Sequence, residues 1–179
     1  NEGEEGRVAS EHQAAFTRRA RFVAVHAFAR FAVAGDDILR GGAYNDILSG
    51  GAGNDQMFGG DGADQFRFFG DQNTGADTDF VRDLDFSEGD TLVFGNYGAG
   101  TFQDDDGMNA FASSTGANSA ASISSWEGVV NAVNFSANVT AFRQAEGNDN
   151  LVLRVTDSDG DIQDVVITGG YSQYISAAG

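Results

Sequence analysis

The sequence predicts an all-β protein built around a short solenoid, and three observations lead to this prediction. The first is a nine-residue repeat in the middle of the chain, in which glycine and aspartate hold fixed positions. The second is the combination of 25 glycines with no proline, which suits repeated tight turns better than a proline-punctuated linker. The third is a pair of apolar-rich stretches, Leu151–Thr156 and Gln163–Thr168, which are typical of strands.

The composition narrows the class of protein. A chain of 179 residues that is 41% hydrophobic is long and apolar enough to bury a core in one domain, with or without an appendage. Its formal net charge of −17 makes nucleic acid an unexpected partner, because phosphate binding needs Lys and Arg. No apolar run approaches the roughly 20 residues that a transmembrane helix requires. The absence of Cys excludes disulfides, thiolate metal sites and thiol nucleophiles.

The N-terminal segment, residues 1–31, differs from the rest of the chain. Arginines alternate with aromatic residues in it, and seven alanines between Ala14 and Ala32 favour a helix. We expect residues 1–31 to form a helical cap over the first coil of the solenoid, or a linker. The alternative is a surface helix that docks on an acidic or lipid partner, or on an upstream domain. The chain begins with Asn and no signal-peptide pattern follows, so we expect it to be a piece of a longer protein.

The second segment, residues 32–67, consists of four nonapeptides in register. In each nonapeptide the sixth position is Asp and the eighth is large and apolar. Glycine is the most frequent residue at positions one, two and four. The copies read AVAGDDILR (Ala32–Arg40), GGAYNDILS (Gly41–Ser49), GGAGNDQMF (Gly50–Phe58) and GGDGADQFR (Gly59–Arg67). A flexible linker would not keep an apolar residue at every ninth position, so the register indicates a folded repeat.

The columns of the repeat indicate how each unit folds. The glycine-rich part can adopt the positive φ angles of a tight turn, and the three residues after each Asp form a short strand with one inward side chain. A single unit cannot bury that side chain, so the units must stack. If each unit makes half a coil, Asp37 and Asp55 line one edge and Asp46 and Asp64 line the other. Stacked carboxylates repel each other, and oxygen ligands of this kind favour a bound calcium ion over magnesium.

These residues resemble the RTX calcium-binding repeats, whose consensus is G-G-x-G-x-D-x-U-x. The resemblance implies a parallel β-roll in which carbonyls at positions two and four and the Asp at position six hold calcium between turns. The implied ligands are Val33, Gly35 and Asp37; Gly42, Tyr44 and Asp46; Gly51, Gly53 and Asp55; and Gly60, Gly62 and Asp64. Tyr44 replaces a consensus Gly, so its carbonyl can coordinate only if the backbone tolerates a side chain there. We expect about two full sites, with open half-sites at the ends.

The third segment, residues 68–179, is expected to cap the roll and to carry a secretion signal. It opens with Thr78–Phe94, which resembles the D-x-x-x-D-F-x-x-G-x-D-x-I-x-L segment that follows the roll in serralysin-type proteases and alginate epimerase modules. Asp85, Phe86, Gly89 and Asp90 fit that pattern with the spacing one residue short, and Asp79 is a candidate extra calcium ligand. The alternative is an ordinary strand–turn–strand hairpin with one wet face.

A short helix and a hairpin are expected further on. Ser124-Ser125-Trp126-Glu127 is a capping-box pattern, and Trp126, Val129, Val130 and Val133 follow with helical spacing as core residues. The acidic loop 157–161 is not an EF-hand, because its Gly is fourth rather than sixth and Thr168 stands where Glu is required. We expect a hairpin turn there. By resemblance to type I secretion substrates, Tyr171–Gly179 would be an uncleaved export signal.

Catalysis has little support in the sequence. His12 and His26 are the only histidines, and the chain contains no H-E-x-x-H, G-x-S-x-G or Walker motif. We therefore expect the chain not to be an enzyme, and any catalytic domain to lie upstream.

The predicted function is that of a secreted calcium-binding module. Residues 32–106 carry three Arg against sixteen acidic residues, net −13, so they should stay expanded until calcium neutralises them. The family resemblance implies passage through the type I secretion machinery and folding outside the cell. One alternative is the C-terminal part of a secreted hydrolase, protease or epimerase. Another is a calcium-rigidified adhesin or surface-layer segment.

Overall fold

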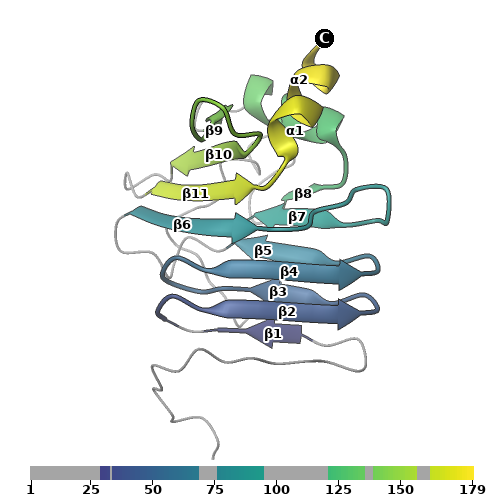
Figure 1. Cartoon of the computed structure of the whole chain (residues 1–179), viewed down its shortest axis with the longest axis vertical. Helices are drawn as coiled ribbons and strands as arrows, with labels where there is room; N and C mark the ends of the chain where they lie inside the picture. Colours follow the sequence, from purple (N-terminus) through teal and green to yellow (C-terminus); the bar gives the residue numbers. More distant parts are fainter. Residues whose placement is uncertain (1–28, 33, 69–75, 95–120, 136–138, 157–161) are drawn as a thin grey trace, which may run out of the picture.

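The structure is a computed structural model that describes residues 29–32, 34–68, 76–94, 121–135, 139–156 and 162–179. The described residues form mainly β-strands, arranged in two sheets, with two short helices near the C-terminus (Figure 1). The prediction of a β-rich protein is therefore confirmed.

The two sheets contain eleven strands between them. In the five-stranded sheet the order is β1 (Ala29–Phe31), β3 (Ile47–Ser49), β5 (Gln65–Phe68), β7 (Thr91–Phe94) and β8 (Ala121–Ile123). In the six-stranded sheet the order is β2 (Ile38–Ala43), β4 (Gln56–Asp61), β6 (Ala76–Val81), β11 (Ile162–Ile167), β10 (Leu151–Thr156) and β9 (Val139–Arg143).

From β1 to β7 the chain alternates between the two sheets, and each strand pairs in parallel with the strand two further on. Leu39 lies opposite Met57, and Leu48 lies opposite Phe66. One full coil is therefore two nonapeptides. The first repeat stacks on the third and the second on the fourth, as predicted.

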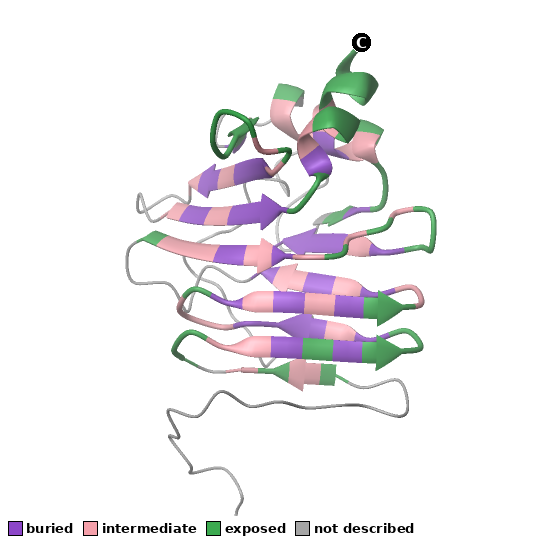
Figure 2. Ribbon diagram, viewed as in Figure 1, coloured by how far each residue is buried: buried purple, intermediate pink, exposed green. Residues whose placement is uncertain are grey.

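The apolar residues at position eight form the core between the sheets. Leu39 is 7% exposed, while Leu48, Met57 and Phe66 are fully buried. The same core continues into Val81, Leu92 and Phe94 in the next coil, so the buried stripe runs without a break toward the C-terminal elements (Figure 2). Burying a side chain of this size contributes about 1.5–3 kcal/mol, and only stacked coils make that burial possible.

The coil extends beyond the four repeats. β6 is parallel to β4 and β7 is parallel to β5, so these two strands lie in different sheets. The hairpin alternative for Thr78–Phe94 is therefore wrong. Met57 lies opposite Val81 and Phe66 lies opposite Leu92, which are sequence separations of 24 and 26 residues instead of 18. These longer connections take β6 and β7 out of the nonapeptide register.

The C-terminal part closes the stack with antiparallel strands and the helices α1 (Trp126–Phe135) and α2 (Gly170–Ala178), which pack against each other. β10 and β11 pair antiparallel over the predicted Leu151–Thr156 stretch, whereas β11 pairs in parallel with β6. β8 is antiparallel to β7. Both sheets are thus mixed, so an all-parallel arrangement holds for β1–β7 and not for the C-terminal strands.

The predicted helix is present as α1. Ser125 caps it, because its Oγ accepts a hydrogen bond from the Gly128 amide at 3.0 Å. Val129 is fully buried, and Trp126 and Val133 pack against the core. Val130 is only half-buried and is not part of that core.

The prediction for residues 1–31 needs one correction. Ala29–Phe31 form strand β1 and not a helix, because their backbone pairs with the edge that Ile47–Ser49 offers. Pairing of this kind overrides the helix propensity of alanine. The helix expected over residues 1–28, the proposed ligand Val33 and the turn at 157–161 lie outside the described residues.

Neither of the helices in the described segments has the length and apolarity to cross a membrane.

Replacement of Tyr44 by Gly should raise the stability of the folded protein by up to about 1 kcal/mol. Tyr44 has φ of 90°, where a side chain costs about 1–2 kcal/mol, and the gain is reduced by the entropy of the new glycine. Thermal unfolding measures the change. Ala43→Gly is the matched control, because Ala43 has no positive φ and should lose roughly 0.5–1 kcal/mol. Equal destabilisation by both substitutions would contradict this account.

Candidate calcium site

The glycines at positions two and four give each turn its shape. Every described residue at these positions has positive φ, including Gly53 at 124° and Gly62 at 128°. Tyr44 keeps the same conformation with φ of 90°, and its side chain points to solvent with 58% of its surface exposed. The backbone condition for Tyr44 to act as a position-four residue is therefore met.

The same glycines allow consecutive coils to approach closely. A Cβ atom on Gly53 would lie 2.7 Å from the carbonyl oxygen of Gly35 in the preceding coil. A Cβ atom on Gly62 would lie 2.6 Å from the carbonyl oxygen of Tyr44. The predicted carbonyl ligands Gly35 and Tyr44 thus face the turns that follow them by one coil. This arrangement brings backbone oxygens from consecutive coils to the same edge of the stack.

Glycine at position one serves the Asp of its own repeat. A Cβ atom on Gly50 would collide with Oδ2 of Asp55, and one on Gly59 would collide with Oδ2 of Asp64. Each Asp side chain therefore folds back over the start of its own turn. The glycine leaves the space that the carboxylate fills.

The position-six carboxylates form a ladder along each edge of the stack. Oδ1 of Asp55 accepts the amide of Asp37 at 2.8 Å, and Oδ1 of Asp64 accepts the amide of Asp46 at 2.7 Å. The structure thus brings these four predicted ligands together as two pairs on opposite edges. Asp55 and Asp64 are completely buried, and Asp46 is 1% exposed.

Asp79 and Asp90 supply the next rungs. Oδ1 of Asp79 accepts the amide of Asp55 at 2.9 Å, and Oδ1 of Asp90 accepts the amide of Asp64 at 2.9 Å. Asp79 is therefore the position-six residue of a further coil. A calcium ligand of the predicted kind would have to occupy that position. Asp90, which matched the family segment but was not counted among the ligands, occupies the same place on the other edge.

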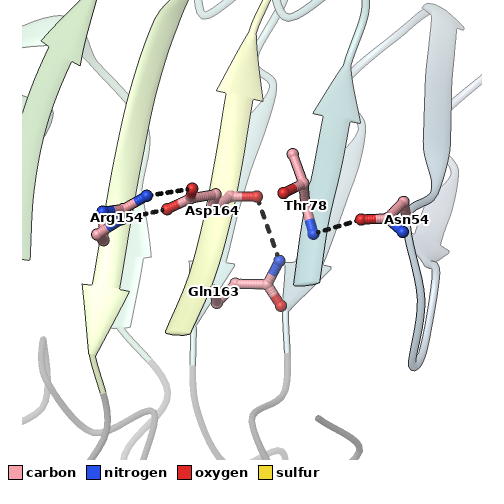
Figure 3. A network of polar contacts seen from close by, with 5 residues as sticks. All are labelled: Asn54, Thr78, Arg154, Gln163 and Asp164. Carbon is pink, nitrogen blue, oxygen red and sulfur yellow. Dashed lines mark hydrogen bonds and ion pairs between the residues drawn. The ribbon is translucent and has the colours of Figure 1, made fainter. Parts of the chain in front are cut away.

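A second ladder runs in the opposite direction through position five. Oδ1 of Asp36 accepts the amide of Asn54 at 2.9 Å, and Oδ1 of Asn54 accepts the amide of Thr78 at 3.0 Å (Figure 3). Position-five side chains thus bond to the following coil, whereas position-six side chains bond to the preceding coil. Figure 3 also shows the bidentate ion pair of Arg154 with Asp164, at 2.8 Å, which joins β10 to β11.

Burial makes the inner ladder electrostatically costly. Desolvation, together with the neighbouring acidic residues, raises the pKa of Asp55 and of Asp64 to about 6, although each carboxylate accepts a backbone hydrogen bond. Desolvation also raises the pKa of Asp79 to about 8. The second oxygen, Oδ2, of Asp55 and of Asp64 is buried with no hydrogen-bond partner among the described residues. Such an oxygen is normally compensated, and a cation can do so.

Asp79 and Asp90 differ from the rungs before them. Oδ2 of Asp79 accepts the side-chain amide of Gln163 at 3.3 Å, and Oδ2 of Asp90 accepts the amide of Asp85 at 2.8 Å. Both oxygens of each carboxylate are therefore bonded within the protein. These two residues close the ladders on the C-terminal side.

Two further acidic residues contact the turns. Asp77 accepts the amide of Gly53 at 3.2 Å, and Asp83 accepts the amide of Gly59 at 2.9 Å. They lie outside the repeat register, so no pattern in the chain pointed to them. Asp79 and Asp90 do carry a signal, because each is followed two residues later by a buried apolar side chain, Val81 or Leu92, as in the repeat.

The donor set fits a hard cation. In the described residues no group of three or more His, Cys, Asp or Glu side chains forms a metal-binding cluster. The turns instead offer position-six carboxylates, which are buried at Asp46, Asp55 and Asp64, together with backbone carbonyl oxygens. Both are ligand types that calcium accepts in flexible geometry. The residues that would hold the ion are the position-six aspartates and the carbonyl groups at positions two and four.

The stacked glycine turns and buried carboxylates define the class, a repeat protein with oxygen-lined sites for a cation between its coils. The family model of the RTX calcium-binding nonapeptide repeat matches residues 31–66 in four copies. Residues 31–66 are thus RTX-type nonapeptide repeats, and the match supports calcium as their ligand. Neither a curated protein nor a solved structure matches the chain.

The metal-free protein should gain β-structure when the pH is lowered from about 7.5 to about 5. The pKa values of about 6 for Asp55 and Asp64 and about 8 for Asp79 lie above the ordinary value of 3.8. The folded state then binds more protons than the unfolded state, so its stability falls as pH rises through this window. Circular dichroism in the presence of a chelator measures the gain. A signal that is constant or falls on acidification would contradict the assignment.

Asp79→Asn should stabilise the metal-free protein at neutral pH and should not weaken its calcium binding by more than threefold. Asparagine keeps the Oδ1 acceptor for the Asp55 amide, and Gln163 can rotate to present its oxygen. The substitution also removes a group whose pKa of about 8 makes it take up a proton on folding at neutral pH, which costs free energy. Chemical denaturation and a calcium titration measure the two effects. Loss of calcium affinity by more than tenfold would show instead that Asp79 is a full ligand.

Proposed function

We propose that calcium binding between the coils folds this chain after its export from the cell. The observation that carries the proposal is the pair of buried Oδ2 atoms of Asp55 and Asp64, which have no hydrogen-bond partner in the described part of the chain. Bound calcium supplies the positive charge that offsets these carboxylates and their acidic neighbours. Under this proposal each turn residue either binds the ion or positions a residue that does.

The turn residues hold and position the ion. Asp37, Asp46, Asp55 and Asp64 provide one carboxylate per half-coil, and the position-two and position-four residues provide carbonyl oxygens. Glycine at position one leaves room for the carboxylate, and the Asp37 and Asp46 amides fix the orientation of the Asp55 and Asp64 side chains through Oδ1. The remaining oxygen of each carboxylate is thereby left for a cation.

Charge repulsion couples this binding to folding. Residues 32–106 carry a net charge of −13, and folding brings the position-six aspartates among them, such as Asp55 and Asp64, into stacked, desolvated rows. Without a cation this repulsion opposes folding, and with one the binding free energy becomes folding free energy. Extracellular calcium modules bind with Kd of about 10⁻⁴ to 10⁻³ M, so this chain would stay unfolded in the cytosol and fold outside.

The proposal includes secretion by a type I system, with the C-terminal residues as the export signal. The family match supports this route, and so does the net charge of −13 on residues 32–106, which opposes folding when no metal is bound. In the folded protein these residues form α2, which leaves Ile175 49% exposed at the end of the molecule. We assign no catalytic step to this chain, and place any catalytic or adhesive activity in a domain upstream of it.

A calcium titration of the chelated protein, followed by far-UV circular dichroism, tests the folding step. We expect a cooperative gain of β-structure with calcium and little or none with magnesium. The double substitution of Asp55 and Asp64 by Asn keeps the Oδ1 acceptors but removes both charges, so the calcium midpoint should rise at least about tenfold.

Glu146→Gln is the matched control, because it removes an exposed charge in the β9–β10 loop and should leave the midpoint unchanged. A chelated wild-type protein that is already fully folded at neutral pH would refute the folding step. So would an unchanged calcium midpoint in the double variant.

Export is tested by removing residues 170–179 and measuring the chain in the medium of cells that express a type I exporter. Secretion should fall at least about tenfold, because the exporter reads the C-terminal end of an unfolded chain. The double Asn variant is the control and should still be secreted, since it keeps that end. Equal secretion of the shortened and complete chains would refute the export signal while leaving the calcium site untouched.

A further inference from the structure

A cavity lies outside the calcium ladders, at the C-terminal end of the molecule. Its volume is about 560 Å³, within the range of about 300–1,000 Å³ that small-molecule sites occupy. Three separate parts of the chain surround it: the β6–β7 connection, the start of α1 and the junction between β11 and α2 (Figure 1). The calcium-binding proposal assigns no function to this cavity.

One wall of the cavity is apolar and held in place. Leu84, Phe86 and Trp126 line it, and the Phe86 and Trp126 rings meet edge to face with centroids 5.1 Å apart. The indole also packs against Gly170, where an added Cβ atom would lie 2.8 Å from the ring. The aromatic wall is therefore positioned before any ligand arrives, which lowers the entropic cost of binding.

The rest of the lining is polar. Within the described residues the side chains of Ser124, Thr168 and Gln173, which line the cavity, have no hydrogen bond to another residue. Asp85 uses Oδ1 to accept from the amide and hydroxyl of Ser87, at 2.8 and 2.6 Å. The cavity thus presents several donors and acceptors beside an aromatic surface.

This combination selects the ligand class. The described lining contains one carboxylate and no cationic side chain, so an anion would be repelled. A metal ion would leave most of the volume and the aromatic wall unused. The polar side chains are exposed to solvent, so a purely apolar ligand would displace water from them without replacing its hydrogen bonds. A pyranose ring has an apolar face for the aromatic wall and hydroxyl groups around its edge. We propose that this cavity binds the pyranose ring of a neutral sugar.

Hydrogen bonds between Asp85 and Asp90 connect the cavity to the coil, and in one of them the amide of Asp90 donates to the carbonyl oxygen of Asp85 at 3.3 Å. The amide of Asp85 donates to Oδ2 of Asp90, the last rung of one ladder, at 2.8 Å. The connection that carries Asp85 and Ser87 is therefore anchored to the coil. For this reason the sugar test is made on the whole chain in calcium, with circular dichroism as a separate check that it is folded.

Trp126 gives a direct readout, because it is the single tryptophan of the chain. We would titrate the protein with the methyl glycosides of glucose, galactose and mannose and follow tryptophan fluorescence. A saturable change with Kd of roughly 1 mM is expected for at least one of them, as suits a ligand of this size. Sorbitol controls for non-specific polyol effects, and tetramethylammonium tests an organic cation in place of a sugar.

Two variants and one control locate the binding. Gln173→Ala and Ser124→Ala each remove an uncommitted polar group from the lining and should weaken sugar binding at least about fivefold. Ser176→Ala changes an exposed position of α2 outside the cavity lining and should have no effect. No saturable change with any sugar, an unchanged Kd in both lining variants, or saturation by tetramethylammonium alone would each overturn the proposal.

Discussion

The structure depends on a ladder of buried aspartates. Folding places Asp55 and Asp64 between coils, where each carboxylate is fixed by one backbone amide and retains one buried oxygen without a partner. The proposed function assigns a cation to that oxygen, because an uncompensated buried charge opposes the coil that contains it. Under this proposal the same side chains orient neighbouring coils and make their stability conditional on a ligand.

The other columns of the repeat follow from this constraint. Glycine at position one makes room for the carboxylate, and glycines at positions two and four let consecutive turns approach within carbonyl contact. The apolar residue at position eight supplies the burial that holds the sheets together once the charge is compensated. At the C-terminal end Asp79 and Asp90 have both oxygens bonded, and antiparallel strands with two helices cover the last coil. The ladder thus ends at two residues whose carboxylate oxygens are all bonded within the protein.

Local patterns in the sequence were enough to predict the coil, and contacts between distant segments were not. The nine-residue period predicted which repeats stack, the buried position eight and the two edges of aspartates. The period did not predict that β6 and β7 continue the coil, because their longer connections break it. Asp79 and Asp90 nevertheless keep the Asp-x-apolar spacing. β1 was expected to be helical because of the alanines around it. It is a strand because pairing with β3 outweighs that local propensity. The cavity joins Asp85, Ser124 and Thr168, which no local pattern relates.

Amide hydrogen exchange at Asp37, Asp46, Asp55 and Asp64 tests the central claim most directly. These four amides donate to the carboxylate of the next coil, so their protection reports the ladder itself. We expect slow exchange in calcium, and exchange close to that of an unfolded chain in a chelator at neutral pH, with or without magnesium. Equal protection of the four amides in calcium and in chelator would contradict the claim that the carboxylate ladder requires a bound cation.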